Sequence, residues 1–420
     1  MGPVRAVPLL LLALLSLAPS PPKPAVEDAA FALDHLERKA GHFFRTKGID
    51  WRRVRAEIGK AAAKAEGNQA HYEVLVRLLA RLRDGHASVR PAESLKDLAW
   101  PGPKLERGPG LFLCVNGPRI LVKSSWGGAE ASGITPGTEV VEIDDLPARK
   151  WLDRRIAEIS DTHSFSTDQQ AEYFACHWGL AGEAGSTLKV KGRTPDGKSK
   201  QATLTRNTGG IVPNGPVFPP EGLQTLGRQS HGRTKSGLGY IHLRDTPGDL
   251  PGQVDAMLES IGDVPGLLLD FRANGGGGFD HEAFMGRFVA KGRTLDGDGV
   301  RYESAGERPF AGPVVVIVDA GVRSAGETAS GIFKEDGRAR MIGESATAGM
   351  SSSKETVELP SKLFSLYFSV ASNKGRFNGG RGIEGIGVPP DEVVPYAPAD
   401  LAAGVDTLLR RAEEILAKPR

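Results

Sequence analysis

A run of five β-branched residues, Val314 to Val318, constrains the fold more than any other feature of the chain. A run without polar alternation is typical of a strand that is buried on both faces. Strands and helices alternate around it through residues 236–398. Strands are expected at 238–243, 266–271, 314–318 and 340–343, and helices at 254–261, 281–289 and 325–333. This alternation predicts an α/β core with a largely parallel sheet.

The remainder of the chain differs from this core in its residue pattern. The full length of 420 residues allows about two to three domains. We expect a signal peptide and Pro-rich spacer at 1–25, a helical N-terminal cap at 27–92, a β-rich module at 93–206, a linker at 207–235, the α/β core at 236–398 and a C-terminal helix at 399–420. Asp50 and Asp400 are the expected N-caps of a helix in the cap and of the C-terminal helix. The chain as a whole is therefore predicted to be multi-domain α+β.

The first 25 residues predict export. Arg5 precedes 13 apolar or small residues, fewer than the ~20 residues of a comfortable membrane span. A positive residue before such a stretch is typical of a secretory signal peptide. We expect a secreted or periplasmic protein, with an uncleaved membrane anchor as the alternative. No later stretch approaches the length of a span.

The charge balance excludes a strongly basic nucleic-acid binder, because 53 Lys and Arg face 51 Asp and Glu. Cys114 and Cys176 do not form a Cys-x-x-Cys pair. We expect two buried thiols, with a disulfide as the alternative. No metal-ligand cluster or phosphate-binding motif is evident, so neither a metal nor another cofactor is expected. The sequence does not predict the oligomeric state.

The turn after the β-branched run contains a serine. Ser324 follows a short glycine-containing turn and precedes the small residues of a predicted helix. Ligands bind at the carboxyl ends of strands in open α/β sheets, and the N–H of Ala325 would be placed to bind an oxyanion. Ser324-x-x-Glu327 is also a capping box, in which the serine only caps the helix. The local pattern leaves both interpretations open.

Two other segments are candidates for chemistry. Gly275 to Gly278 follow a buried strand and Asn274, and their N–H groups could bind an anion. The loop lacks the lysine of a Walker A motif and the last glycine of a Rossmann fingerprint. An oxyanion loop and a flexible turn both remain open. His86 follows an amphipathic helix and is a candidate base, although a lone histidine is usually structural.

These residues together resemble the tail-specific, or C-terminal-processing, serine peptidases of the S41 type. The resemblance rests on segments in the family order: Asp50-Trp51 with Leu82-Arg83-Asp84-Gly85-His86, the PDZ-like 131–144, Asp270-x-Arg272-x-Asn274-Gly275-Gly276-Gly277, Ser324-Ala325-Gly326-Glu327, Gly343-Glu344-x-x-Thr347-x-Gly349, and Glu384-Gly385-Ile386-Gly387-Val388-Pro389-Pro390-Asp391. The resemblance implies an S41-like peptidase core and a PDZ-like β-rich module. In that module, Gly110-Leu111-Phe112-Leu113 resembles a peptide-binding loop.

The resemblance is nearer to the tricorn-core-like branch than to the Ser-Lys dyad branch. The dyad lysine directly follows the Thr-x-Gly turn, where this chain has Met350, and Lys354 is the nearest lysine and the alternative base. The tricorn-like branch uses a histidine in the helical lead-in and a carboxylate near the carboxyl end, and His86 and Glu384 match these positions. Gly85 stands where that branch has a serine, so the coupling of Glu384 to His86 stays open.

The implied function is an exported serine endopeptidase that hydrolyses peptide bonds in unfolded or C-terminal segments of proteins. Ser324 would form an acyl-enzyme with His86 as general base, oriented by Glu384 or alternatively by Asp84. The oxyanion would be bound by the N–H groups of Gly275, Gly276 and Ala325. Activity is then expected to rise with pH through the ordinary histidine titration near ~6.5. The alternative is a non-catalytic S41-fold protein that binds an apolar ligand or a peptide, which Met350 would suit.

Overall fold

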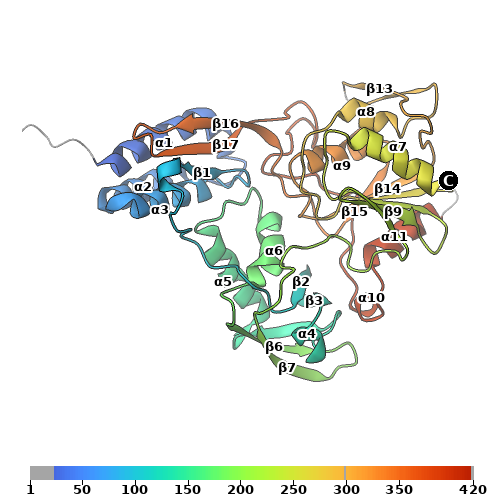
Figure 1. Ribbon diagram of the computed structural model, residues 1–420, viewed down its shortest axis with the longest axis horizontal. Coiled ribbons are helices and arrows are strands. Elements are labelled where there is room, and N and C mark those ends of the chain that lie inside the picture. The colour runs from blue at the N-terminus through green and yellow to red at the C-terminus, as the bar shows by residue number, and fades with distance from the viewer. Residues whose placement is uncertain (1–22, 298, 418–420) are drawn as a thin grey trace, which may run out of the picture.

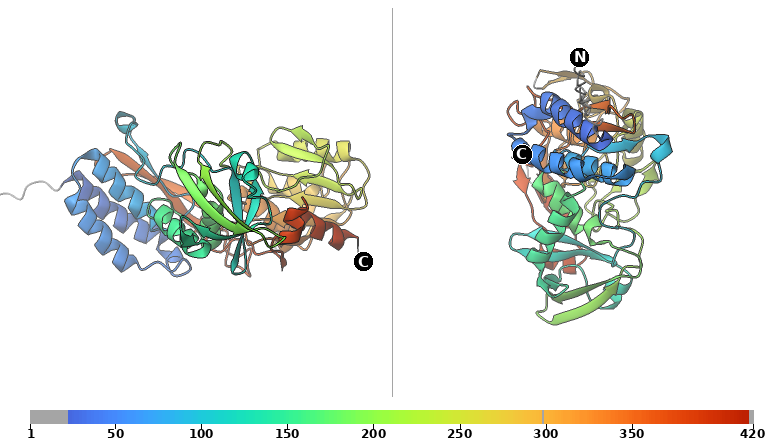
Figure 2. Two further views of the ribbon diagram at one scale, coloured as in Figure 1. Left: turned by 90° about the horizontal axis from the view of Figure 1, so that it is seen from below. Right: turned by 90° about the vertical axis from the view of Figure 1, so that its left-hand side faces the viewer.

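The computed structural model describes residues 23–297 and 299–417 in three regions: a helical cap, a β-rich module and an α/β core. The cap and the core lie at opposite ends of the long axis, and the β-rich module projects from one side between them (Figures 1 and 2). The predicted signal peptide falls on residues 1–22, outside the described residues, and the expected spacer already becomes helical at Pro24. Within the described residues, no helix is both long and apolar enough to cross a membrane.

Seven strands form the core sheet, in the order β18-β15-β14-β11-β10-β9-β8. Their bounds are β8 (Gln224–Leu226), β9 (Gln229–Arg233), β10 (Gly239–His242), β11 (Leu267–Asp270), β14 (Val314–Val318), β15 (Arg340–Gly343) and β18 (Glu392–Val393). The five strands from β18 to β10 are parallel, which confirms the predicted α/β core. β9 runs antiparallel to β10, and β8 runs antiparallel to β9, in a range that was expected to be a linker. That prediction was wrong because these polar strands join the sheet through backbone hydrogen bonds rather than through an apolar pattern.

Alternate residues of the central strand face two different apolar clusters. Val316 and Val318 pack with the cluster of α7 (Leu250–Ile261), α8 (His281–Gly286) and α9 (Ala325–Glu335). Val315 and Ile317 pack in a second cluster that includes α11 (Thr407–Leu416). Burial on both faces therefore accounts for the β-branched run. A short hairpin of β12 (Thr294–Asp296) and β13 (Arg301–Glu303) lies against α8.

The C-terminal helix differs from the prediction because it is broken. α10 (Pro398–Ala402) ends before Gly404, which has a φ of +71° that a helix cannot continue through. Asp406 then caps α11 by accepting from Leu408 N and Leu409 N, so Asp400 is not the cap of the long helix. Asp400 instead lies inside α10.

The cap is built from two distant parts of the chain. Its helices are α1 (Pro24–Ala40), α2 (Trp51–Lys64) and α3 (Gly67–Ala80), with single 3₁₀ turns at Gly41–Phe43 and Glu93–Leu95. Asp50 caps α2 as predicted. β1 (Ser88–Pro91) pairs with β17 (Phe364–Ser372), which pairs with β16 (Ser352–Glu358). This β16–β17 hairpin leaves the range expected to be core, because Phe364, Leu366 and Phe368 cover the apolar faces of the helices.

The β-rich module is a six-stranded antiparallel sheet, in which five strands follow the order β2-β3-β4-β6-β7 and β5 pairs with β4. Its strands are β2 (Leu111–Asn116), β3 (Arg119–Ser125), β4 (Glu139–Ile143), β5 (Leu146–Pro147), β6 (Thr187–Arg193) and β7 (Ser199–Thr205). Its helices, which the sequence reasoning did not assign, are α4 (Gly128–Ala131), α5 (Ala148–Ser160) and α6 (Asp168–Cys176), followed by a 3₁₀ turn at Trp178–Leu180. Cys114 and Cys176 are buried free thiols, as predicted.

Candidate active site

Ser324 lies in the turn between β14 and α9, at the carboxyl end of a central strand. It has a φ of +56° and forms the predicted capping box, in which Ser324 N donates to Glu327 Oε2 at 3.2 Å. A left-handed backbone at a non-glycine residue is uncommon and is concentrated at functional turns. The serine therefore caps α9 and also occupies the sharp strand-to-helix turn expected for a nucleophile, where its side chain is partly exposed.

His86 reaches Ser324 from the cap, across a separation of 238 residues, and its Nε2 lies 3.3 Å from Ser324 Oγ. The backbone N–H of His86 donates to Asp84 Oδ1 at 2.9 Å. Asp84 also accepts from the N–H and the hydroxyl of Ser369 in β17, at 2.7 and 2.9 Å. Asp84 thus fixes the backbone at His86, whereas the buried Nδ1 of His86 has no hydrogen-bond partner within the described residues.

Glu384 is buried beside this pair. Its Oε1 accepts from Lys47 Nζ at 2.7 Å and from Ser166 Oγ at 3.1 Å. Its Oε2 has no partner among the residues that the structure describes. One polar atom from each of Asp84, His86 and Glu384 lies within 4.8 Å of the others. The structure thus brings together all three residues of the expected relay without a direct hydrogen bond from Glu384 to the described His86 ring.

Sequence reasoning missed the polar residues that hold this relay. Lys47 follows α1, and Ser164 and Ser166 precede α6 in the β-rich module. Ser164 Oγ accepts from the N–H of Asp84 at 2.7 Å, and Ser166 Oγ accepts from the next N–H along the chain at 2.9 Å. Serines and lysines are common in loops, so no local pattern marks these three. Only the packing of cap, module and core shows that they belong to the site.

Gly85 is needed by close packing. A Cβ at this position would lie 2.7 Å from Met350 Sδ and 2.8 Å from Gln170 Nε2. A serine would not fit there without displacing these side chains. The hydroxyl that contacts Glu384 comes instead from Ser166, on another element.

Burial shifts the pKa values of the two titrating groups of the relay, His86 and Glu384, in opposite directions. Burial lowers the pKa of His86 to about 4, although the charge of Asp84 opposes this shift. Burial raises the pKa of Glu384 to about 7, opposed by Lys47 and reinforced by Asp84. Near neutral pH, His86 is therefore uncharged and able to accept a proton, while Glu384 is close to its midpoint.

The glycine loop, residues 273–278, lies against the serine turn, residues 319–324. A Cβ on Gly276 would lie 2.8 Å from Ser324 Cβ and 3.2 Å from Ala325 N. Two of the three expected oxyanion donors are not free, because Gly275 N donates to a backbone carbonyl at 2.9 Å and Gly276 N donates to Asn274 Oδ1 at 2.8 Å. Ala325 is the first residue of α9, and its N–H has no intrahelical acceptor.

Neither Met350 nor Lys354 is placed to act as the base of a Ser-Lys dyad. Met350 is 6% exposed, and its Sδ accepts from Gln170 Nε2 at 2.9 Å. Lys354 is exposed on β16, and within the described residues no hydrogen bond or ion pair joins it to Ser324. Glu327 secures the segment that leads into Met350, because it accepts from Thr347 Oγ1, Gly349 N and Met350 N at 2.5, 2.6 and 2.8 Å.

The only described His, Cys, Asp and Glu cluster with the spacing of a cation site is again Asp84, His86 and Glu384. Lys47 already places an ammonium group 2.7 Å from Glu384, so a bound cation would meet a like charge. The arrangement therefore fits proton transfer better than metal binding.

The expected peptide-binding loop, Gly110 to Leu113, lies at the start of β2, an edge strand of the module sheet. α6 packs beside this strand, and the small cavity between them is also lined by Ala320 and Ser345 of the core. Leu111 and Leu113 are buried in the apolar cluster of the module itself, and Phe112 packs against Trp126 and His177.

The comparisons with known proteins identify the core. Residues 237–394 match peptidase family S41. We refer to the α/β core, which carries this match, as the S41 domain. The chain is 26% identical over 345 residues to the chloroplastic C-terminal processing peptidase of Tetradesmus obliquus, covering 77% of this chain and 69% of the relative. It is 22% identical over 365 residues to the carboxyl-terminal-processing protease of Picosynechococcus sp. PCC 7002, covering 84% and 79%.

The fold extends this match beyond the S41 domain. The structure of mature CPAF complexed with lactacystin aligns with a TM-score of 0.65 at 14% identity, over 94% of this chain and 97% of that chain. This likeness shows a shared fold for cap, module and core. The family match and the relatives together support a serine-type peptidase that acts on protein substrates.

Proposed function

We propose that this protein is an exported serine endopeptidase that cleaves unfolded or C-terminal segments of proteins through an acyl-enzyme on Ser324, with His86 as general base. The observation that carries the proposal is the 3.3 Å separation of His86 Nε2 and Ser324 Oγ, two atoms that the fold brings together from residues 238 positions apart. A serine hydroxyl is a weak nucleophile and needs such an adjacent base.

The proposed reaction follows from this pair. Ser324 Oγ attacks the scissile carbonyl carbon while His86 Nε2 accepts the hydroxyl proton. When the tetrahedral intermediate collapses, the C–N bond breaks and the imidazolium donates the proton to the leaving amine. Water then attacks the acyl-enzyme with the same histidine as base, which releases the new carboxyl group and restores Ser324.

Glu384 is the proposed partner of the imidazolium. Its Oε2 and the Nδ1 of His86 are both buried without a partner within the described residues. Buried polar atoms of this kind are commonly bridged by an ordered water. The carboxylate, held by Lys47 and Ser166, would then stabilise the positive charge that forms on His86. Asp84 is left with a backbone role because Ser369 and the N–H of His86 occupy its oxygens.

Ala325 N–H is the proposed first donor to the tetrahedral oxyanion. One such donor is typically worth ~2.7–4 kcal/mol in the transition state. A second donor from Gly275 or Gly276 would require the loop to release a bond that its N–H makes in this structure.

Export and substrate class rest on the sequence and on the relatives. The 13-residue apolar stretch after Arg5 supports a signal peptide, and the curated relatives are named as C-terminal-processing enzymes. The Gly110–Leu113 segment at the edge strand β2 is proposed to bind substrate peptide by strand addition. The binding-protein alternative is not favoured, because the relatives are peptidases and Ser324 has a base within reach.

The test compares the purified protein with its Ser324→Ala variant on an unfolded protein and on a peptide pool. Cleavage by the parent alone is expected, together with labelling of Ser324 by a serine-directed phosphonate. His86→Ala should abolish both readouts, whereas Lys354→Ala should leave them intact. An active His86→Ala variant, or a parent that is neither active nor labelled, would contradict the proposal.

A further inference from the structure

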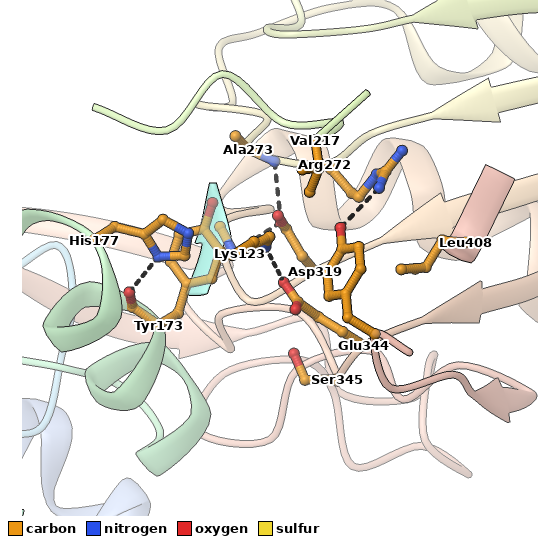
Figure 3. A network of polar contacts seen from close by, with 12 residues as sticks. Lys123, Tyr173, His177, Val217, Arg272, Ala273, Asp319, Glu344, Ser345 and Leu408 are labelled. Atoms are coloured by element: carbon orange, nitrogen blue, oxygen red, sulfur yellow. Dashed lines mark hydrogen bonds and ion pairs between the residues drawn. The ribbon is translucent and has the colours of Figure 1, made fainter. Parts of the chain in front are cut away.

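A buried charge cluster joins the β-rich module to the S41 domain (Figure 3). Lys123 of β3 donates to Glu344 Oε1 at 2.7 Å, and their side chains are 4% and 13% exposed. Glu344 follows β15 in the core, in a segment that the proposed chemistry does not use. Asp319, at the end of β14, is fully buried in the same cluster. Lys123 thus pairs directly with Glu344, and it acts on Asp319 through charge alone, because within the described residues Asp319 Oδ2 has no hydrogen-bond partner.

Asp319 connects both loops that form the catalytic site. Its Oδ1 accepts from Ala273 N at 3.0 Å and from Gly321 N at 2.9 Å. Ala273 begins the glycine loop, and Gly321 lies in the serine turn three residues before Ser324. One carboxylate oxygen thus fixes the glycine loop relative to the nucleophile. Hydrogen bonds to an ionised acceptor are roughly twice as strong as neutral ones.

Both of these loops contain strained backbone that needs support. Ala273 and Ser324 have φ values of +57° and +56°. Such left-handed conformations cost about 1–3 kcal/mol each and persist only where the surroundings enforce them. Further support comes from Arg323 N, which donates to Asn274 O at 3.1 Å. Loss of the Asp319 bonds would leave this single backbone bond to hold the loops together.

The charge state of Asp319 depends on its neighbours. Burial raises its pKa to about 6, Lys123 opposes the shift and Glu344 reinforces it. Without Lys123, two buried carboxylates would share the site without their ammonium partner. The other titratable or charged groups around the cluster are Arg272 after β11, Tyr396 before α10, Cys114 of β2, and Tyr173, Cys176 and His177 in or directly after α6. Arg272 is already paired with Asp270 and Asp406, so it cannot replace Lys123.

We propose that Lys123 is a positioning residue through which the β-rich module organises the active site: its ammonium group keeps Asp319 ionised, and ionised Asp319 holds the glycine loop and the serine turn in register. This inference rests on the proposed function for its catalytic consequence. Its structural part, the coupling of Lys123 to the two loops, stands independently. A β-rich module that is displaced from the core would, on this basis, also disorder the site.

The test uses the full protein with Lys123→Met, Asp319→Asn and the double variant. The matched control is Lys191→Met, a half-exposed lysine of the same module that pairs with Glu142. The first readout is hydrogen exchange in peptides covering 271–277 and 319–325, each compared with wild type at the same pH. The second is the rate of phosphonate labelling of Ser324. Circular dichroism verifies that each variant is folded.

Lys123→Met should exchange faster in both peptides at about pH 7 and label on the order of 10²-fold more slowly, because small displacements of reacting groups have that effect. Both defects should shrink near pH 9, where Asp319 ionises again without its lysine. Asp319→Asn should show the same defects at both pH values, and adding Lys123→Met should change nothing further. Lys191→Met should match wild type.

A Lys123→Met defect of equal size at both pH values would overturn the inference, as would wild-type exchange in Asp319→Asn. If Lys123→Met does not fold, Asp319→Asn decides the question, because it removes a buried charge without removing the lysine. A wild-type protein that is never labelled would contradict the proposed function, and hydrogen exchange would still decide the coupling.

Discussion

At the scale of single residues, burial shifts the pKa values of His86 and Glu384 in opposite directions. With an ordinary histidine pKa of ~6.5, His86 was expected to cause the loss of activity at acidic pH. The structure lowers the pKa of His86 to about 4 and raises that of Glu384 to about 7. His86 is then in its basic form across the neutral range, and the group that changes charge near neutrality is the carboxyl.

We therefore expect kcat/KM to rise as the pH increases through about 7, because Glu384 must be ionised to stabilise the imidazolium. Glu384→Gln should lower kcat/KM at pH 8 by on the order of 10²-fold. The residual activity of this variant should no longer rise near pH 7. It should change with pH only near pH 4, where His86 titrates. The measurement is a pH profile of peptide cleavage, with the exposed Glu358→Gln as control. If the rise in kcat/KM near pH 7 persists in Glu384→Gln, this assignment is wrong.

At the scale of elements, α9 owes its position to Glu327 as much as to Ser324. Glu327 accepts from the serine backbone and from three groups of the 347–350 segment, so the helix start and this segment are fixed together. Burial raises the pKa of Glu327 to about 8, which makes the protonated carboxyl the main form at neutral pH. Each oxygen accepts two of these bonds, so a glutamine would keep one acceptor oxygen but turn its NH2 group toward two donors.

Glu327→Ala should lower the free energy of unfolding by about 2–4 kcal/mol, because it leaves buried N–H groups without an acceptor. Glu327→Gln should lose less, since its amide oxygen can still accept. Chemical denaturation at pH 7 measures both variants. The exposed Glu259→Ala on α7 is the control. Equal losses in the Ala and Gln variants would show that the charge itself is needed.

The β16–β17 hairpin is the second element with a role at the site. It covers the helices of the cap and also supplies Ser369 to Asp84. Ser369→Ala should reduce kcat about tenfold with little change in KM, because one of the hydrogen bonds that fix Asp84 is lost while the substrate contacts remain. Steady-state kinetics test this, with Ser365→Ala on the same strand as control. A change confined to KM would instead place Ser369 in substrate binding.

At the scale of the whole molecule, the site exists only where three regions meet. The cap contributes His86, Asp84 and Lys47, the β-rich module contributes Ser166, and the S41 domain contributes Ser324 and Glu384. The Lys47–Glu384 pair is almost fully buried and joins the cap to the core. Removing one partner of such a pair leaves an uncompensated charge in the interior.

Lys47→Met should therefore lower the free energy of unfolding by about 3–5 kcal/mol at pH 8, where Glu384 is ionised. Because the folded pKa of Glu384 is raised above its unfolded value, its ionisation costs stability as the pH rises, and this cost grows without Lys47. The loss should be much smaller at pH 5, where Glu384 is protonated. Thermal or denaturant unfolding at the two pH values measures it, with the exposed Lys60→Met on α2 as control. An equal loss at both values would indicate lost packing alone.

Features that depend on neighbouring residues could be predicted from the amino-acid order alone. The β-branched run predicted a strand buried on both faces, the capping box predicted the start of α9, and the ordered motifs predicted the S41 core. His86 and Glu384 were found only because the motifs resemble a family. Hydrophobic periodicity and capping act over a few residues, which is why they can be read locally.

Contacts between distant segments became evident only in the tertiary structure. It brought Lys47 and Ser166 to Glu384, placed the β16–β17 hairpin in the cap, and engaged the N–H of Gly275 with the carbonyl of Arg244. It also lowered the pKa of His86, because burial depends on everything packed around the ring. These contacts form between segments up to 337 residues apart, and hydrogen bonds over such separations leave no periodicity in the chain.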